Sequence, residues 1–166
     1  MERCEECGYE YDLAAATRAG DDIRVGVAEL ARLLSTAGRD TLTQRTAPEL
    51  WSPLEYACHV RDMLLTQRER VLLARRVELP DAVPMGRDQR VAHEGYAEQD
   101  PVEVAEELTM AARLLANVLG RLDAADWELR LVYNWPEPTE RTLRWVAAHT
   151  LHEVRHHLLD VRRQLR

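Results

Sequence analysis

The sequence has no lysine and no phenylalanine, and it has little glycine, proline or cysteine. Its 166 residues include seven glycines, seven prolines and three cysteines. Few residues therefore interrupt helices, while alanine, leucine, glutamate and arginine, which favour helix, dominate the composition. All 22 basic residues are arginine, a bias typical of GC-rich genomes because lysine codons are AT-rich. We expect a helical protein from a source of the actinobacterial type.

Long apolar runs and excess positive charge are absent as well. No segment approaches the ~20 apolar residues that a membrane-spanning helix needs, and no apolar run of signal-peptide length follows Met1. We therefore expect a cytoplasmic protein without a membrane partner, whose cysteines are thiols or metal ligands rather than disulfides. The net charge of −7 argues against nucleic acid as a partner.

Apolar residues recur at helical spacing in four segments, which predicts a single domain over residues 1–166. The predicted helices cover residues 21–36, 52–76, 100–120 and about 139–166. Ser52 and Glu55 form a capping box at the second helix, Asp100 begins the third, and Thr139 or Thr142 caps the fourth.

The remaining stretches contain no convincing strand pattern. Residues 79–99 form a long connection, with a short helical piece at 87–96, and connections of this length often act as lids or binding loops. The predicted fold is therefore an all-α, antiparallel four-helix bundle with a long crossover connection.

The fourth predicted helix carries many side chains that can bind metals. Residues 149–160 include four of the six histidines and two carboxylates. Positions three and four apart share a helix face, which gives one row of His149, Glu153 and His157, a second row of His152 and His156, and Asp160 between them. Two ligands one turn apart can hold a divalent metal when a third comes from elsewhere. The alternative is an ordinary solvated polar face.

The apolar stripe of this helix favours one row as the inner one. Glu153 and His157 lie about 70–110° from the centre of the stripe, whereas His152 and His156 lie about 150–170° from it. Glu153 and His157 are thus the better metal pair, and we expect His152 and His156 at the rim or in solvent. His149, higher in the inner row, is a candidate to support a ligand.

His59 is the candidate third ligand. It lies at the edge of the apolar face of the second predicted helix. A lone histidine there is usually a satisfied residue at the edge of the core, but beside Glu153 and His157 it becomes the natural partner.

The N-terminal extension, residues 1–20, contains a C-x-x-C-G knuckle at Cys4, Cys7 and Gly8. A structural zinc site needs a second pair of ligands, and Cys58, the other cysteine, is isolated. A packed or mobile N-terminus is the favoured interpretation. A zinc half-site completed by a histidine or by another subunit, and a redox-active pair, are the alternatives.

These motifs resemble the DinB-like superfamily, which includes mycothiol-dependent maleylpyruvate isomerases and related thiol S-transferases. The resemblance rests on Trp51-Ser52, Glu55-Tyr56 and His59 in the second helix, and on the residues from His149 to Asp160 in the fourth. It implies a bundle, often dimeric, that holds a divalent metal through His59, Glu153 and His157. The match to the isomerase branch is the pattern E-V-x-x-H-x-x-D from Glu153 to Asp160. We expect two departures from the isomerases, namely the lack of their C-terminal domain and the presence of Cys4 and Cys7.

The function implied by this resemblance is that of a metal-dependent thiol S-transferase or isomerase. Such an enzyme would use a low-molecular-weight thiol such as mycothiol and a small-molecule electrophile, and it would form a homodimer. Zinc is the favoured metal, with nickel and iron as alternatives. The alternative function is a non-catalytic, stress-associated metal-binding bundle. A role on damaged DNA is opposed by the acidic charge.

Overall fold

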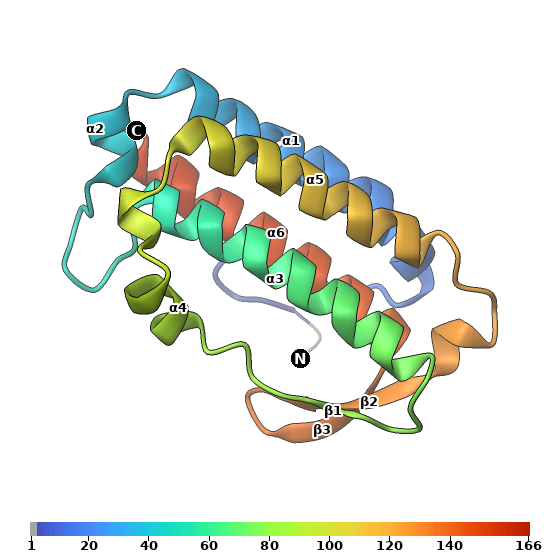
Figure 1. Cartoon of the computed structure of the whole chain (residues 1–166). Coiled ribbons are helices and arrows are strands. Elements are labelled where there is room, and N and C mark those ends of the chain that lie inside the picture. The colour runs from blue at the N-terminus through green and yellow to red at the C-terminus, as the bar shows by residue number, and fades with distance from the viewer. Residues whose placement is uncertain (1–2) are drawn as a thin grey trace.

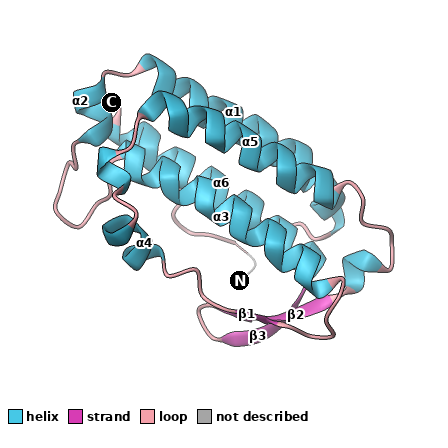
Figure 2. Cartoon of the chain, in the orientation of Figure 1, coloured by secondary structure: helices cyan, strands magenta, loops and turns pink. Residues whose placement is uncertain are grey.

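The computed structural model describes residues 3–166, and four long helices dominate it (Figures 1 and 2). They are α1 (Ala19–Thr36), α3 (Pro53–Ala74), α5 (Pro101–Leu119) and α6 (Leu143–Gln164). Helix α1 packs against α5 and α6, and α3 packs against the same two helices. The predicted four-helix bundle is confirmed.

The connection between α3 and α5 determines the directions of the helices. It returns along the bundle, so that α5 begins at the same end as α3 and runs parallel to it (Figure 1). Helices α3 and α6 are antiparallel, as are α1 and α5. The predicted long crossover is therefore present. It lies over the pair formed by α3 and α6, on the side to which the N-terminal segment also runs.

The helix starts follow the predicted capping residues. The Glu55 backbone N–H donates to the Ser52 side chain at 3.2 Å, and the Ser52 N–H donates to the Glu55 carboxylate at 2.7 Å. Asp100 caps α5 and Thr142 caps α6. Because the cap fixes where α3 begins, it also fixes the position of His59, one and a half turns into that helix.

The expectation that the chain has no strand was wrong. A small sheet has the order β1 (Asp81–Ala82), β2 (Arg130–Asn134) and β3 (Pro138–Thr142), with β1 parallel to β2 and β2 antiparallel to β3. The strands are short and β3 is largely exposed, so the alternating burial of β2, over five residues, is the one periodic signal of the sheet. The sheet joins the crossover to the segment that precedes α6.

The shorter helices lie in the connections and the N-terminal segment. They are η1 (Ala14–Arg18), α2 (Arg39–Thr43), α4 (Arg87–His93), η2 (Tyr96–Glu98) and η3 (Asp126–Glu128). The predicted helical piece of the crossover is thus present as α4 and η2. Over residues 3–166, no helix combines the length and the apolar character that a membrane span requires.

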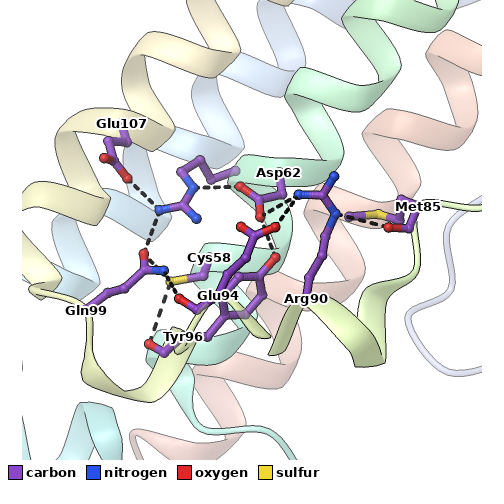
Figure 3. A network of polar contacts seen from close by, with 9 residues as sticks. Cys58, Asp62, Met85, Arg90, Glu94, Tyr96, Gln99 and Glu107 are labelled. Atoms are coloured by element: carbon purple, nitrogen blue, oxygen red, sulfur yellow. Dashed lines mark hydrogen bonds and ion pairs between the residues drawn. The ribbon is translucent and has the colours of Figure 1, made fainter. Parts of the chain in front are cut away.

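A buried polar network fixes the end of the crossover to α3 (Figure 3). The hydroxyl of Tyr96, which is fully buried, donates to Asp62 Oδ2 at 2.5 Å. The guanidinium groups of Arg61 and Arg90 approach the same carboxylate at 2.8 and 3.4 Å. Burial opposes ionisation of Asp62, but the hydrogen bonds from Arg61 and Tyr96 outweigh it and lower the pKa of this carboxyl. The network also includes Glu107 of α5, which accepts from Arg61, so it joins α3 to α5 as well.

Candidate metal centre

A cavity of about 640 Å³ lies between α3, α6, the crossover and the β2–β3 hairpin. We call it the central cavity. Five of the six histidines lie in it, and only His93, exposed on α4, lies outside. A second cavity of about 430 Å³, between α3 and α5, has no histidine or cysteine among the described residues that line it. The histidines that could bind a metal within residues 3–166 are therefore those of the central cavity.

The structure brings His59, Glu153 and His157 together, and we call them the histidine–glutamate site. Each offers one ligand atom, and these atoms lie within 4.8 Å of one another. The imidazole rings of His59 and His157 have their centroids 4.9 Å apart, and His157 Nε2 lies 3.6 Å from Glu153 Oε2. The three residues proposed from the sequence thus converge from two antiparallel helices.

Asp160 orients His157 within this site. Its Oδ2 lies 3.1 Å from His157 Nδ1, which leaves Nε2 facing Glu153. A carboxylate on the far nitrogen of a ligand histidine is the usual partner in metal sites, because it fixes the tautomer and makes the ring a better ligand.

The charges of the site suit a cation. Burial opposes ionisation of Glu153, but hydrogen bonds from His152 and His157 lower the pKa of its carboxyl far below the usual range. Burial lowers the pKa of His59 to about 3, so this ring is neutral at neutral pH. Burial also acts against protonation of His157, but Asp160 and Glu153 outweigh it and raise the pKa of His157 to about 8.

The residues present fit a divalent metal. His59 is 4% exposed, and among the described residues its Nδ1 has no hydrogen-bond partner. Two imidazoles and one ionised carboxylate are a common ligand set for zinc and for related transition metals. Such a set leaves one coordination position for water or a substrate.

The second row of α6 is covered, which differs from the sequence-based expectation. His152 is 6% exposed rather than lying at the rim, and His156 is half-buried. Tyr9 and Tyr11 of the N-terminal segment lie against His152, with ring centroids 5.5 Å away in each case. The helical wheel could not predict this burial because it considers only the residues of one helix. The side chains that cover His152 belong to a segment more than 140 positions earlier in the chain.

Tyr11 links two histidines of α6. Its hydroxyl lies 2.8 Å from His149 Nδ1 and 3.0 Å from His152 Nδ1. Burial lowers the pKa of His149 to about 4, so this ring is neutral at neutral pH. His149 therefore helps to position His152, because both rings contact the same Tyr11 hydroxyl. It also lies close to Glu153.

The N-terminal cysteines lie beside the same row. Cys4 is buried, and the ligand atoms of Cys4, Cys7, His152 and His156 lie within 4.8 Å of one another. We call these four residues the cysteine–histidine cluster. Burial opposes ionisation of Cys4, but backbone N–H groups of the knuckle and the nearby imidazoles of His152 and His156 outweigh it and lower the pKa of its thiol to about 6. The N-terminal segment is thus packed against α6, and its cysteines approach two histidines, as the alternative of a half-site completed by histidine requires.

Cys58 takes no part in either group. Its Sγ lies 3.4 Å from Gln99 Oε1, within the network of Figure 3. Burial raises the pKa of the Cys58 thiol to about 12. It is an unreactive buried thiol and supplies a natural control.

Comparisons with known proteins identify the family and the fold. The sequence model of the DinB superfamily matches residues 24–161. Among solved structures, the chain resembles YfiT from Bacillus subtilis, described as a probable metal-dependent hydrolase with an unusual four-helix bundle topology. The TM-score is 0.82 at 13% sequence identity, over 90% of this chain and 85% of YfiT, a likeness that shows the fold. No curated protein matches the chain.

Proposed function

The chain belongs to the DinB superfamily, and from this premise we propose that it is a metal-dependent enzyme acting through the histidine–glutamate site. In this proposal the nucleophile is a low-molecular-weight thiol such as mycothiol. The reaction is transfer of the thiol to a small electrophile, or a thiol-dependent isomerisation.

The observation that carries the proposal is that His59, Glu153 and His157 converge and line the central cavity. A structural metal site is normally closed by four protein ligands, whereas a catalytic one keeps a free position. A divalent ion held by His59, Glu153 and His157 would supply that position and would lower the pKa of a thiol or water bound there. The volume of about 640 Å³ lies within the range of small-molecule sites.

The residues of the site have separate tasks. His59 would supply a neutral nitrogen ligand. His157, whose pKa is raised to about 8, would supply a second one after the metal displaces its proton, and Asp160 orients its ring through Nδ1. Glu153 supplies a negative charge that offsets part of the charge of the ion. Together these residues would hold the ion in place before any substrate enters.

The walls of the central cavity suit a thiol with polar substituents. Met63 and Met85 give it an apolar, sulfur-containing surface, which displaces water and strengthens electrostatic interactions inside. Arg70 and Arg87 also line the cavity and offer positive charge to an anionic group of the thiol or the electrophile. Arg70 is held in place, because its guanidinium lies 4.9 Å from the ring centroid of Tyr133 and donates to the Val83 carbonyl at 2.5 Å.

Hydrolysis is the second candidate, favoured by the likeness to YfiT, which is described as a probable metal-dependent hydrolase. In that case water takes the place of the thiol. A non-catalytic metal-binding bundle is the third. The three candidates differ in the substrates that they consume. The first consumes a thiol and an electrophile, the hydrolase consumes an ester or amide, and the non-catalytic bundle consumes none.

A turnover assay with a panel of thiols tests the proposal. We expect the metal-loaded protein to consume a small electrophile only when a thiol, mycothiol included, is present, and we expect a chelator to stop the reaction. The variant His59→Ala should lose activity and keep its helical circular-dichroism spectrum. His93→Ala, which removes the exposed histidine outside the cavity, is the matched control and should remain active.

The outcomes separate the candidates. Turnover of esters or amides without thiol would replace the transferase with a hydrolase. If no substrate reacts, or if His59→Ala and chelation leave the rate unchanged, the enzyme proposal fails.

A further inference from the structure

The two rows of α6 are offset by one residue, and each contains an i, i+4 pair of metal-binding side chains. Glu153 and His157 meet His59 of α3, whereas His152 and His156 meet Cys4 and Cys7 of the N-terminal segment. Successive residues on a helix point about 100° apart, so the two pairs serve different places. No ligand of one group is needed by the other.

The backbone of the knuckle presents its two cysteines together. The Gly8 N–H donates to the Cys4 carbonyl at 2.8 Å, and the Cys4 N–H donates to the Tyr9 carbonyl at 2.8 Å. These bonds close a tight turn, in which Gly8 adopts a φ of +73° that residues with a Cβ rarely take. The turn brings the side chains of Cys4 and Cys7 to the face of the segment that meets α6.

One histidine nitrogen in the cysteine–histidine cluster is buried and unpaired. His152 Nδ1 lies 3.0 Å from the Tyr11 hydroxyl and 3.3 Å from Glu153 Oε1. The other nitrogen, Nε2, is buried and has no hydrogen-bond partner among residues 3–166. An unpaired buried polar atom destabilises the folded protein, so its position beside two thiols points to a ligand that binds there.

The second histidine is oriented in a matching way. His156 Nδ1 lies 3.6 Å from Cys4 Sγ, while His156 Nε2 lies 3.4 Å from Glu6 Oε2 and 3.7 Å from Asp160 Oδ2. Both histidines therefore turn one nitrogen to the cysteines and the other toward a carboxylate. This is the arrangement that orients histidines around a metal.

From these observations we propose that Cys4, Cys7, His152 and His156 form a second metal site, closed and structural, that takes zinc. Two thiolates balance the charge of Zn²⁺, and two neutral imidazoles complete a tetrahedral set with no position left for substrate. Binding requires both cysteines as thiolates and both histidines as neutral rings, so the protons that these four groups still hold pass to solvent, and no oxidant is involved. The zinc fastens the N-terminal segment to α6, over the second row and next to Glu153.

This site is independent of the proposed function. Its ligands are distinct from His59, Glu153 and His157, and a non-catalytic bundle would hold the zinc equally well. It does, however, link the two groups physically, because His152 with Nε2 on zinc carries its proton on Nδ1 and donates it to Glu153 or Tyr11.

Metal analysis and cobalt substitution of the full chain test the inference. We expect the purified protein to hold two ions per chain, and we expect its cobalt form to show the thiolate-to-cobalt charge-transfer absorption that a nitrogen–oxygen site cannot give. The double variant Cys4→Ser/Cys7→Ser should retain one ion and lose that absorption. His59→Ala should also retain one ion but keep the absorption. Cys58→Ala should behave as wild type.

A variant on α6 tests the same site without changing the N-terminal segment, whose folding the cysteine substitutions could disturb. His156→Ala removes a half-buried ring from an intact knuckle, and it should lose the same ion as the cysteine variant. The inference is overturned if the cysteine variant keeps the wild-type metal content. It is also overturned if mass spectrometry finds a Cys4–Cys7 disulfide in the metal-replete protein, since the pair would then be redox-active. If His59→Ala alone leaves the metal content unchanged, the proposed enzyme fails while this site stands.

Discussion

Replacing Asp160 is expected to weaken metal binding at the histidine–glutamate site far more than at the cysteine–histidine cluster. Asp160 Oδ2 lies 3.1 Å from His157 Nδ1 but 3.7 Å from His156 Nε2. The first distance is that of a hydrogen bond and the second is beyond one. His156 also has Glu6 at 3.4 Å, so it depends less on Asp160.

The size of the effect follows from these contacts. Loss of a carboxylate partner from a ligand histidine typically costs about 10–100-fold in metal affinity, which is about 1.4–2.7 kcal/mol. Asp160→Asn keeps an oxygen acceptor for His157 but removes its charge, so we expect a loss of about tenfold. Asp160→Ala removes both and should approach about 100-fold. The cysteine–histidine cluster should change by no more than a few-fold.

A cobalt titration against a competing chelator measures both affinities in one sample, because only the cysteine–histidine cluster gives the thiolate absorption. Arg163→Ala is the matched control, since Arg163 contacts the same carboxylate from the surface at 3.8 Å without touching a histidine ring. The reasoning is refuted if the Asp160 variants bind both ions as tightly as wild type, or if Arg163→Ala weakens binding as much as Asp160→Ala.

Two further predictions concern stability. Tyr11→Phe leaves the buried Nδ1 of His149 without a donor, and because Tyr11 is only half-buried we expect a loss of about 1–2 kcal/mol in urea unfolding of the metal-free protein. The Tyr9 hydroxyl has no hydrogen bond in the described part of the chain, so Tyr9→Phe should lower the free energy of unfolding by less. Equal losses in the two variants would contradict the role of Tyr11 between His149 and His152. Asp62→Asn should destabilise the protein at neutral pH, because the ionised carboxylate accepts from Tyr96. Since folding lowers the pKa of Asp62, its contribution is fully present above the pKa of the unfolded chain, about 3.9. The difference between wild type and Asp62→Asn should therefore shrink below about pH 4, and a constant difference would argue against an ionised Asp62.

The bundle was predictable because its signals are local. The Ser52–Glu55 capping box and the caps at Asp100 and Thr142 depend on residues within one turn, and helical periodicity needs only the helix itself. The histidine–glutamate site was proposed for a related reason, since spacing along α6 and one histidine on α3 suggested its members. That these residues bind a metal remains a prediction.

The missed features depend on contacts between distant segments. Strands β2 and β3 are held by their pairing with each other, and of the two only β2, over five residues, shows alternating burial. His152 was expected near solvent because nothing on α6 indicates that Tyr9 and Tyr11 cover it. The i, i+4 spacing of His152 and His156 matches the two ligands that Cys4 and Cys7 lack, but spacing alone could not select this pair from the other histidines.

Anomalous-scattering crystallography of the zinc-loaded protein tests the central claim most directly, because it locates each ion against its ligands. The account predicts a peak bound by His59, Glu153 and His157, with metal–nitrogen distances of about 2.0–2.2 Å and one side open to the central cavity. A second peak should lie among Cys4, Cys7, His152 and His156. A single ion held by His152 and His156, with Glu153 turned away and His59 unligated, would contradict it.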